Sequence, residues 1–207
     1  MSLIAIDVAI LPPDDISQRA IELSAALPAS EGRGLRLDAE HLPHITLVQL
    51  FVRPEELDVA LDDVGAVVRD MPPLRLRVAG GGQSRQTVWL TIDRTPPLDA
   101  LHDRLMHALR GVERQSATPA AFADGDARPG DVLWVSTYRL KAAFGSFTPH
   151  ITLGHARRPP HVEPFEFDAR TVGACHLGRF CTCRRVLRRW TLSAPDSALP
   201  DNSRQRP

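Results

Sequence analysis

The sequence predicts an α+β protein built as two pseudo-symmetric βαβ-type lobes, with antiparallel sheets around a central cleft. Three observations lead to this fold class. The string Pro-His-Ile-Thr-Leu occurs twice, at residues 43–47 and 149–153, once in each half of the chain. Segments with strand-like alternation follow segments with helical spacing throughout. The chain has 207 residues, 43% of them hydrophobic, which is enough for two small lobes packed as one unit.

The first quarter of the chain indicates strand, helix, strand and helix in turn. Residues 3–11 are mostly apolar and predict a strand, which two prolines end. A helix to about Leu27 follows, with aspartates at its start that can cap it. After a polar, Gly-rich loop, residues 44–52 predict a strand that carries the first repeat. Pro54 then begins a second helix, at a position where the missing N–H has no partner to lose.

The middle of the chain predicts two strands and a third helix. Residues 74–78 and 87–92 are the strands. Between them, residues 80–82 are three glycines, and no Lys-Ser/Thr follows as a phosphate loop would require. We therefore predict a flexible hairpin connection there. Leucines at helical spacing predict a helix over 98–109.

The second half is less regular before its repeat. Residues 113–131 are rich in Ala, Pro, Gly, Asp and Arg, and predict a mobile loop. Residues 132–144 fit either a strand or a helix. The second repeat predicts a strand over 148–153. Residues 165–177 and 181–192 are expected to be a closing pair of strands.

Composition limits the possible functions. The net charge is +0, so a strongly basic nucleic-acid surface is absent and any RNA contact needs a local patch. No apolar run approaches the roughly 20 residues that span a bilayer. The start of the chain contains Asp7 and lacks a basic segment, unlike a signal peptide. The three clustered cysteines are no disulfide framework and favour a reducing compartment. We expect a cytoplasmic monomer that does not bind membranes, with one bilobal domain over 1–193 and a disordered tail over 194–207.

The repeats carry the residues that could take part in catalysis. Alternate side chains of a strand share a face, so His44 would project with Thr46, and His150 with Thr152. Imidazole can both take and give a proton near neutrality. Hydrolysis of a cyclic phosphodiester needs a base for the attacking water and an acid for the departing oxygen. Threonine hydroxyls can donate hydrogen bonds to the phosphate oxygens.

A duplication that served packing alone would keep the Ile and Leu of each repeat but not its His and Thr. We therefore predict a catalytic set of His44, Thr46, His150 and Thr152, with no metal and no cofactor.

The two His-x-Thr motifs resemble the signature of the 2H phosphoesterase superfamily, in particular its bacterial 2′-5′ RNA ligase-like branch, the RNA 2′,3′-cyclic phosphodiesterases. The resemblance extends to Val88-Trp89-Leu90, to the helix with His102 and to the closing strand with Trp190. It implies metal-independent hydrolysis of 2′,3′-cyclic phosphates of RNA ends or nucleotides to 2′-phosphomonoesters. By position, it implies His44 as general acid and His150 as the base that activates water.

Two other functions remain open. A 2′-5′ RNA end ligase would run the reverse reaction at the same site, and a nucleotide-binding module would keep the site without turnover. The long segment 113–131 and the extended C-terminus leave the substrate undefined, because members of the superfamily act on RNA ends, cyclic mononucleotides and ADP-ribose cyclic phosphates.

Further contacts with substrate are predicted at Phe51 and Arg179. Phe51, like Trp89, could stack on a base, although both also suit a core. Arg179 belongs to the densest basic cluster, which could follow an RNA backbone or form a solvated strand edge. Zinc ligands by residue type are Cys175, His176, Cys181 and Cys183, but they lack paired Cys-x-x-Cys spacing, so we predict no metal site there.

Overall fold

The computed structural model describes residues 3–28 and 34–193. Its strands form one antiparallel sheet in the order β6-β3-β4-β5-β2-β1-β7-β8. The strands are β1 (Ile4–Leu11), β2 (Ile45–Val52), β3 (Leu74–Ser84), β4 (Thr87–Ile92), β5 (His150–His155), β6 (Phe165–Ala169), β7 (Thr171–Leu177) and β8 (Cys183–Thr191). The predicted α+β class with antiparallel sheets is confirmed, and the sheets of the two predicted lobes are the two halves of this one sheet.

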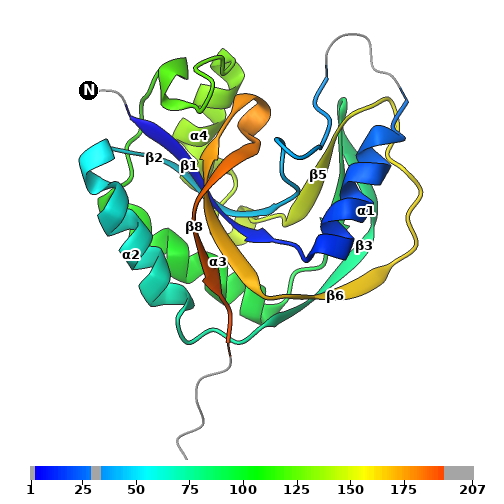
Figure 1. The fold of residues 1–207 in the computed structure, drawn as a ribbon, viewed down its shortest axis with the longest axis horizontal. Helices are drawn as coiled ribbons and strands as arrows, with labels where there is room; N and C mark the ends of the chain where they lie inside the picture. Colours follow the sequence, from blue (N-terminus) through cyan, green and yellow to red (C-terminus); the bar gives the residue numbers. More distant parts are fainter. Residues whose placement is uncertain (1–2, 29–33, 194–207) are drawn as a thin grey trace, which may run out of the picture.

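Four α-helices flank the sheet in the described residues (Figure 1). They are α1 (Asp14–Ala25), α2 (Leu57–Val68), α3 (Pro96–Ala108) and α4 (Pro129–Lys141). Helices α3 and α4 pack against β2, and α2 packs against α3 and β8. Helix α1 crosses to the other half and packs against β5, where Ser24 Oγ donates a hydrogen bond to Leu153 O at 2.6 Å. The helix that follows β1 therefore supports the strand with the second repeat.

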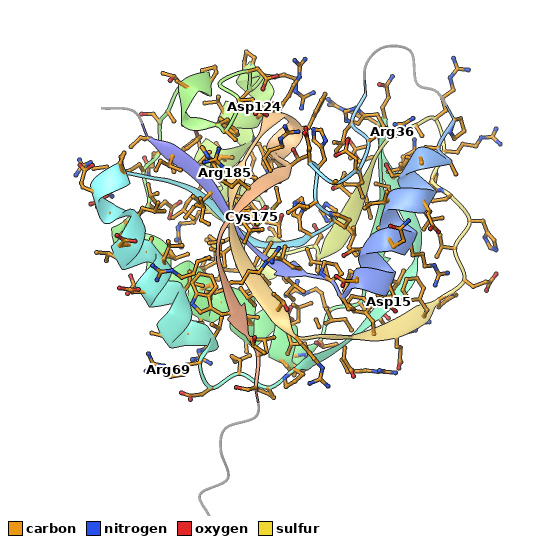
Figure 2. The ribbon with its side chains drawn as sticks, in the orientation of Figure 1. Asp15, Arg36, Arg69, Asp124, Cys175 and Arg185 are labelled. Atoms are coloured by element: carbon orange, nitrogen blue, oxygen red, sulfur yellow. The ribbon has the colours of Figure 1, made fainter. Side chains whose placement is uncertain are left out.

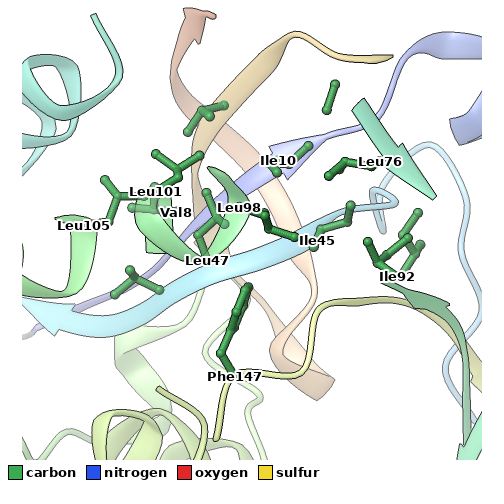
Figure 3. Packing of buried hydrophobic residues seen from close by; sticks show 14 of the residues in the cluster. Val8, Ile10, Ile45, Leu47, Leu76, Ile92, Leu98, Leu101, Leu105 and Phe147 are labelled. Atoms are coloured by element: carbon green, nitrogen blue, oxygen red, sulfur yellow. The ribbon is translucent and has the colours of Figure 1, made fainter. Parts of the chain in front are cut away.

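The main core lies between α3 and the central strands (Figure 3). Leu98, Leu101 and Leu105 recur at helical spacing on α3 and are fully buried over β1 and β2. Each such leucine contributes about 1.5–3 kcal/mol when it leaves water. The start of α3 is fixed by Thr95, whose Oγ1 accepts a hydrogen bond from Leu98 N at 3.4 Å.

Two strand predictions were wrong in detail. Residues 80–82 lie inside β3, not in a connection. The hairpin turn consists of the two residues between Ser84 and Thr87. Residues 165–177 do not form one strand. The chain breaks at Arg170, so that β6 pairs with β3 while β7 pairs with β1 in the other half of the sheet. The segment thus joins the two halves.

The ambiguous segment 132–144 belongs mainly to helix α4, which begins at Pro129. Asp131 caps this helix by accepting a hydrogen bond from Arg128 N at 2.9 Å. Within the predicted loop 113–131, residues 119–121 form a 3-10 helix and Phe122 is buried. The predicted tail, 194–207, lies outside the described residues.

Candidate functional site

The two repeats lie side by side at the centre of the sheet. Ile45 of β2 pairs with Ile151 of β5 in antiparallel register. The residues on either side of this pair then face each other across the strands, Thr46 towards His150 and His44 towards Thr152. Both isoleucines are fully buried in the core, so the four polar residues share the opposite face of the sheet. We call this the site face.

The two candidate catalytic histidines, His44 and His150, are oriented in the same way. His44 Nδ1 lies 2.7 Å from Leu42 O, and His150 Nδ1 lies 2.7 Å from Thr148 O. A carbonyl oxygen only accepts hydrogen bonds, so each Nδ1 carries the hydrogen. Each Nε2 is therefore free to take a proton from a substrate group or to give one to it. The repeat duplicates the ring orientation as well as the residue type.

Burial lowers the pKa of both rings. His44 is only 8% exposed, whereas His150 is partly exposed, as are both threonines. Burial is the largest cause of the lowered pKa at each histidine, and a positive charge on His44 would lower the pKa of His150 further. Without a ligand, this environment favours neutral imidazole, the form that can act as a base.

Asp7 of β1 completes the site, and it was not among the predicted site residues. Its side chain is fully buried. Oδ2 accepts hydrogen bonds from Thr46 Oγ1 and from Gln49 Nε2, each at 2.7 Å, and lies 3.7 Å from His44 Nε2. Burial raises the pKa of Asp7 to about 7, against the lowering effect of these two hydrogen bonds. Burial therefore keeps the Asp7 carboxyl partly protonated near neutrality, next to His44.

A β-bulge places the partners of Asp7. The β1–β2 register pairs Val8 with Val48 but Ala9 with Thr46, so Leu47 is the extra residue. Because of this extra residue, Thr46 and Gln49 both turn to the site face. Leu47 O accepts hydrogen bonds from His102 Nδ1 at 2.7 Å and from Tyr138 Oη at 3.2 Å. His102 thus has a structural role: it fixes the bulge.

Trp89 of β4 lies beside the second histidine. Its ring is 5.3 Å from the His150 ring at an angle of 47°, and its Nε1 donates a hydrogen bond to Thr91 Oγ1 at 3.2 Å. The indole occupies the space next to Gly82, where a Cβ would come within 2.3 Å of Nε1. This packing explains why a glycine stands inside β3. Trp89 therefore supports the orientation of His150.

The two predicted substrate contacts lie apart from this group. Phe51 is fully buried and packs edge-on against Phe122 at 5.9 Å, so no face of its ring is open to a base. Arg179 is exposed on the turn between β7 and β8, where it pairs with Asp126 at 3.6 Å. No contact joins Arg179 to the repeat residues within the described ranges.

The cysteine-rich group considered for zinc does not gather as a set. His176 Nε2 bonds Ala121 O at 2.9 Å, and Cys181 Sγ lies 3.8 Å from Asp131 O. Among the described residues, the group that could hold a metal is Asp7, His44 and Cys183, one ligand atom of each lying within 4.8 Å of the others. This group includes one of the predicted catalytic residues.

A family model, the 2'-5' RNA ligase superfamily, matches residues 12–172. The chain belongs to this superfamily. That membership confirms the resemblance found in the two motifs. Comparison with curated proteins finds no match.

Solved structures share the fold of this superfamily member. TT0787 of Thermus thermophilus is 20% identical over 92% of this chain and 99% of its own, with a TM-score of 0.62. LigT of E. coli complexed with 3'-AMP is 23% identical over 92% of this chain and 99% of its own, also with a TM-score of 0.62. None of the helices described here is long and apolar enough to cross a membrane.

Proposed function

We propose that this protein hydrolyses 2′,3′-cyclic phosphates of RNA ends or nucleotides to 2′-phosphomonoesters, by acid–base catalysis that needs no metal. One observation carries the proposal: the pairing of Ile45 with Ile151 puts two His-x-Thr motifs on one face around a local two-fold relation. The site then offers two imidazole Nε2 atoms and the Thr152 hydroxyl to one phosphate. Structures of E. coli LigT with 3'-AMP, ATP and phosphate support this substrate class.

The proposed reaction uses one histidine on each side of phosphorus. His150 Nε2 takes a proton from water while the water oxygen attacks phosphorus. The bond from phosphorus to the 3′-oxygen breaks, and His44 gives its Nε2 proton to that oxygen. The 2′-ester bond remains, so the product is a 2′-phosphomonoester. Each proton transfer contributes roughly 10²–10⁴-fold to the rate.

Asp7 supports the assignment of His44 as the acid. An ionised carboxylate 3.7 Å from His44 Nε2 favours the imidazolium, in opposition to burial. Among the described residues, no carboxylate lies at ion-pair distance from His150, whereas Asp7 Oδ2 lies 3.7 Å from His44 Nε2. The two motifs are alike in backbone register and differ in this neighbour. We therefore assign the proton donor to His44 and the water-activating base to His150.

The two threonines also differ. In the part of the chain that the structure describes, the Thr152 hydroxyl has no hydrogen-bond partner, so it can donate to a phosphate oxygen. The Thr46 hydroxyl donates to Asp7 Oδ2. In this proposal, Thr152 binds phosphate and Thr46 holds the carboxylate towards His44. Thr46 is available to phosphate only when Asp7 carries a proton and can donate to it.

The family match favours one alternative, a 2′-5′ RNA end ligase. The 5′-hydroxyl of a second RNA would replace water as the nucleophile at the same site, with the same proton transfers. A nucleotide-binding module without turnover is the other alternative.

A substrate panel in excess chelator separates these functions. It contains 2′,3′-cyclic nucleotides, RNA with a cyclic phosphate end, ADP-ribose cyclic phosphate, and the cyclic-ended RNA together with 5′-hydroxyl RNA. Phosphorus NMR identifies the product, and the double variant His44→Ala/His150→Ala is the control. Release of a 2′-phosphomonoester that needs both histidines supports the proposal. Joined RNA without hydrolysis indicates a ligase, and binding without any product indicates a nucleotide-binding module; either result contradicts it.

A further inference from the structure

We propose that Asp7, His44 and Cys183 form a Zn²⁺ site, and that zinc bound there inhibits the enzyme by occupying His44. The inhibitory effect rests on the proposed function, whereas the metal site does not. The three residues come from different parts of the chain: β1, the start of the first repeat and β8. The site would make the enzyme sensitive to zinc although catalysis requires no metal.

The three ligand atoms already lie close together. One atom from each residue is within 4.8 Å of the others, and His44 Nε2 is 3.7 Å from Asp7 Oδ2. Bonds of about 2.0–2.3 Å to a tetrahedral zinc place its ligands roughly 3.3–3.8 Å apart. A small inward shift of side chains thus suffices. Imidazole nitrogen, thiolate sulfur and carboxylate oxygen are the three ligand types that zinc takes in proteins.

His44 and Asp7 each keep one side-chain atom that no hydrogen bond uses. His44 Nδ1 is used by Leu42 O, which leaves Nε2 for a metal, as the outer hydrogen bond of a metal-bound histidine usually does. Asp7 Oδ1 is buried and has no hydrogen-bond partner among the described residues. A buried acceptor without a donor is unfavourable, and a cation would relieve this. Both observations point to a cationic ligand at this position.

The backbone of Leu42 links Cys183 to His44. Leu42 N donates a hydrogen bond to Cys183 O at 3.0 Å, while Leu42 O accepts from His44 Nδ1. One residue therefore fixes Cys183 beside His44. Cys175 on β7 lies near the centre of the molecule (Figure 2) and packs with Cys183 in a small buried cluster. The thiolate would form in a rigid part of the sheet.

Zinc must displace a proton from Cys183. Burial raises the pKa of this thiol well above its usual value, and a hydrogen bond with Cys175 and the charges of Asp7 and Cys181 act in the same direction. The thiol is therefore protonated without metal, and zinc affinity should rise with pH as that proton is released. The bond from zinc to His44 Nε2 uses the lone pair that holds the catalytic proton, so the metal-bound enzyme has no acid.

Metal binding can be measured without any substrate. The full-length protein, first freed of metal with a chelator, is titrated with Co²⁺ as a spectroscopic probe and with Zn²⁺ in competition. We expect one equivalent of Co²⁺ to give a thiolate-to-cobalt charge-transfer band that Zn²⁺ abolishes. Cys183→Ala should lose the band and weaken zinc binding by more than the roughly 10–100-fold typical of losing an outer partner. Cys183→Ser is the second variant, and Cys181→Ala is the matched control that keeps the band.

Inhibition is then measured as the ratio of rates with and without Zn²⁺, each variant against its own metal-free rate. Wild type and Cys181→Ala should lose turnover at stoichiometric zinc and regain it with chelator, and Cys183→Ala should resist. Absence of the cobalt band, or equal zinc affinity in folded Cys183→Ala and Cys183→Ser, overturns the site. Full turnover with the site occupied overturns the inhibition. If no cyclic phosphate is hydrolysed, the proposed function fails, while the cobalt titration still decides the metal site.

Discussion

Ile45 of β2 lies opposite Ile151 of β5 in the middle of the eight-stranded sheet. Each residue is the centre of one Pro-His-Ile-Thr-Leu repeat, so this pair turns a duplicated sequence into a two-fold arrangement of imidazoles and hydroxyls. Asp7 breaks the symmetry, because it contacts Thr46 and lies near His44 only. Two identical motifs can therefore carry different roles.

Asp7→Asn should move one limb of the pH–rate profile. The acid must be protonated, so the rate falls as pH rises through its apparent pKa. Loss of the carboxylate lowers that pKa, because it no longer favours the imidazolium of His44. The alkaline limb of kcat should shift to lower pH, while the acidic limb, set by the base, should move little. Asp58→Asn removes an exposed carboxylate on α2 and is the matched control. An unchanged alkaline limb in Asp7→Asn would rule out the proposed acid pair.

Ionisation of Asp7 should also make the free energy of unfolding depend on pH. Its pKa rises from 3.8 to about 7 on folding, so the fold favours the neutral carboxyl. This contribution is present below pH 3.8 and is lost as pH rises through about 7. At about 1.4 kcal/mol per pKa unit, the change is at most about 4 kcal/mol. Asp7→Asn has no carboxyl to ionise at this position. Its free energy of unfolding, relative to that of wild type, should therefore increase from pH 4 to pH 8. Urea unfolding at both pH values measures this, and a constant difference between the two proteins would contradict a buried, titrating Asp7.

The two threonines should respond differently to valine. Thr152→Val removes a phosphate donor and should lower kcat by roughly 10²–10³-fold, as loss of one oxyanion donor does, with little change in stability. Thr46→Val removes a hydrogen bond to the buried Asp7 carboxyl and should also destabilise the protein by about 1–3 kcal/mol. Steady-state kinetics and urea unfolding of both variants test this. Equal losses of stability would argue against the distinction.

The sequence predicts the repeats, their strands and the face that they share, because strand alternation is a local property. Asp7 carries the only charge in the apolar stretch 3–11, which could have marked it as a buried functional group. The hydrogen-bond partners of Asp7 could not be predicted from the sequence, because the bulge that places them depends on contacts of Leu47 with His102 and Tyr138, far along the chain.

The mistaken elements have the same cause. The triple glycine predicts a turn, but Gly82 is a glycine because the indole of Trp89 lies against it. The break at Arg170 depends on which strands β6 and β7 join in the folded sheet. Local patterns record neither the packing partner of a glycine nor the point where a strand changes partners.

The most direct test of the central claim compares turnover of a 2′,3′-cyclic nucleotide by His44→Ala and by His150→Ala with that of wild type. Circular dichroism and urea unfolding confirm that both variants are folded. If the repeats supply one acid and one base, each substitution lowers kcat by roughly 10²–10⁴-fold, and the double variant loses less than the product of the two. Near-normal turnover in either folded variant would contradict paired acid–base catalysis by the two motifs.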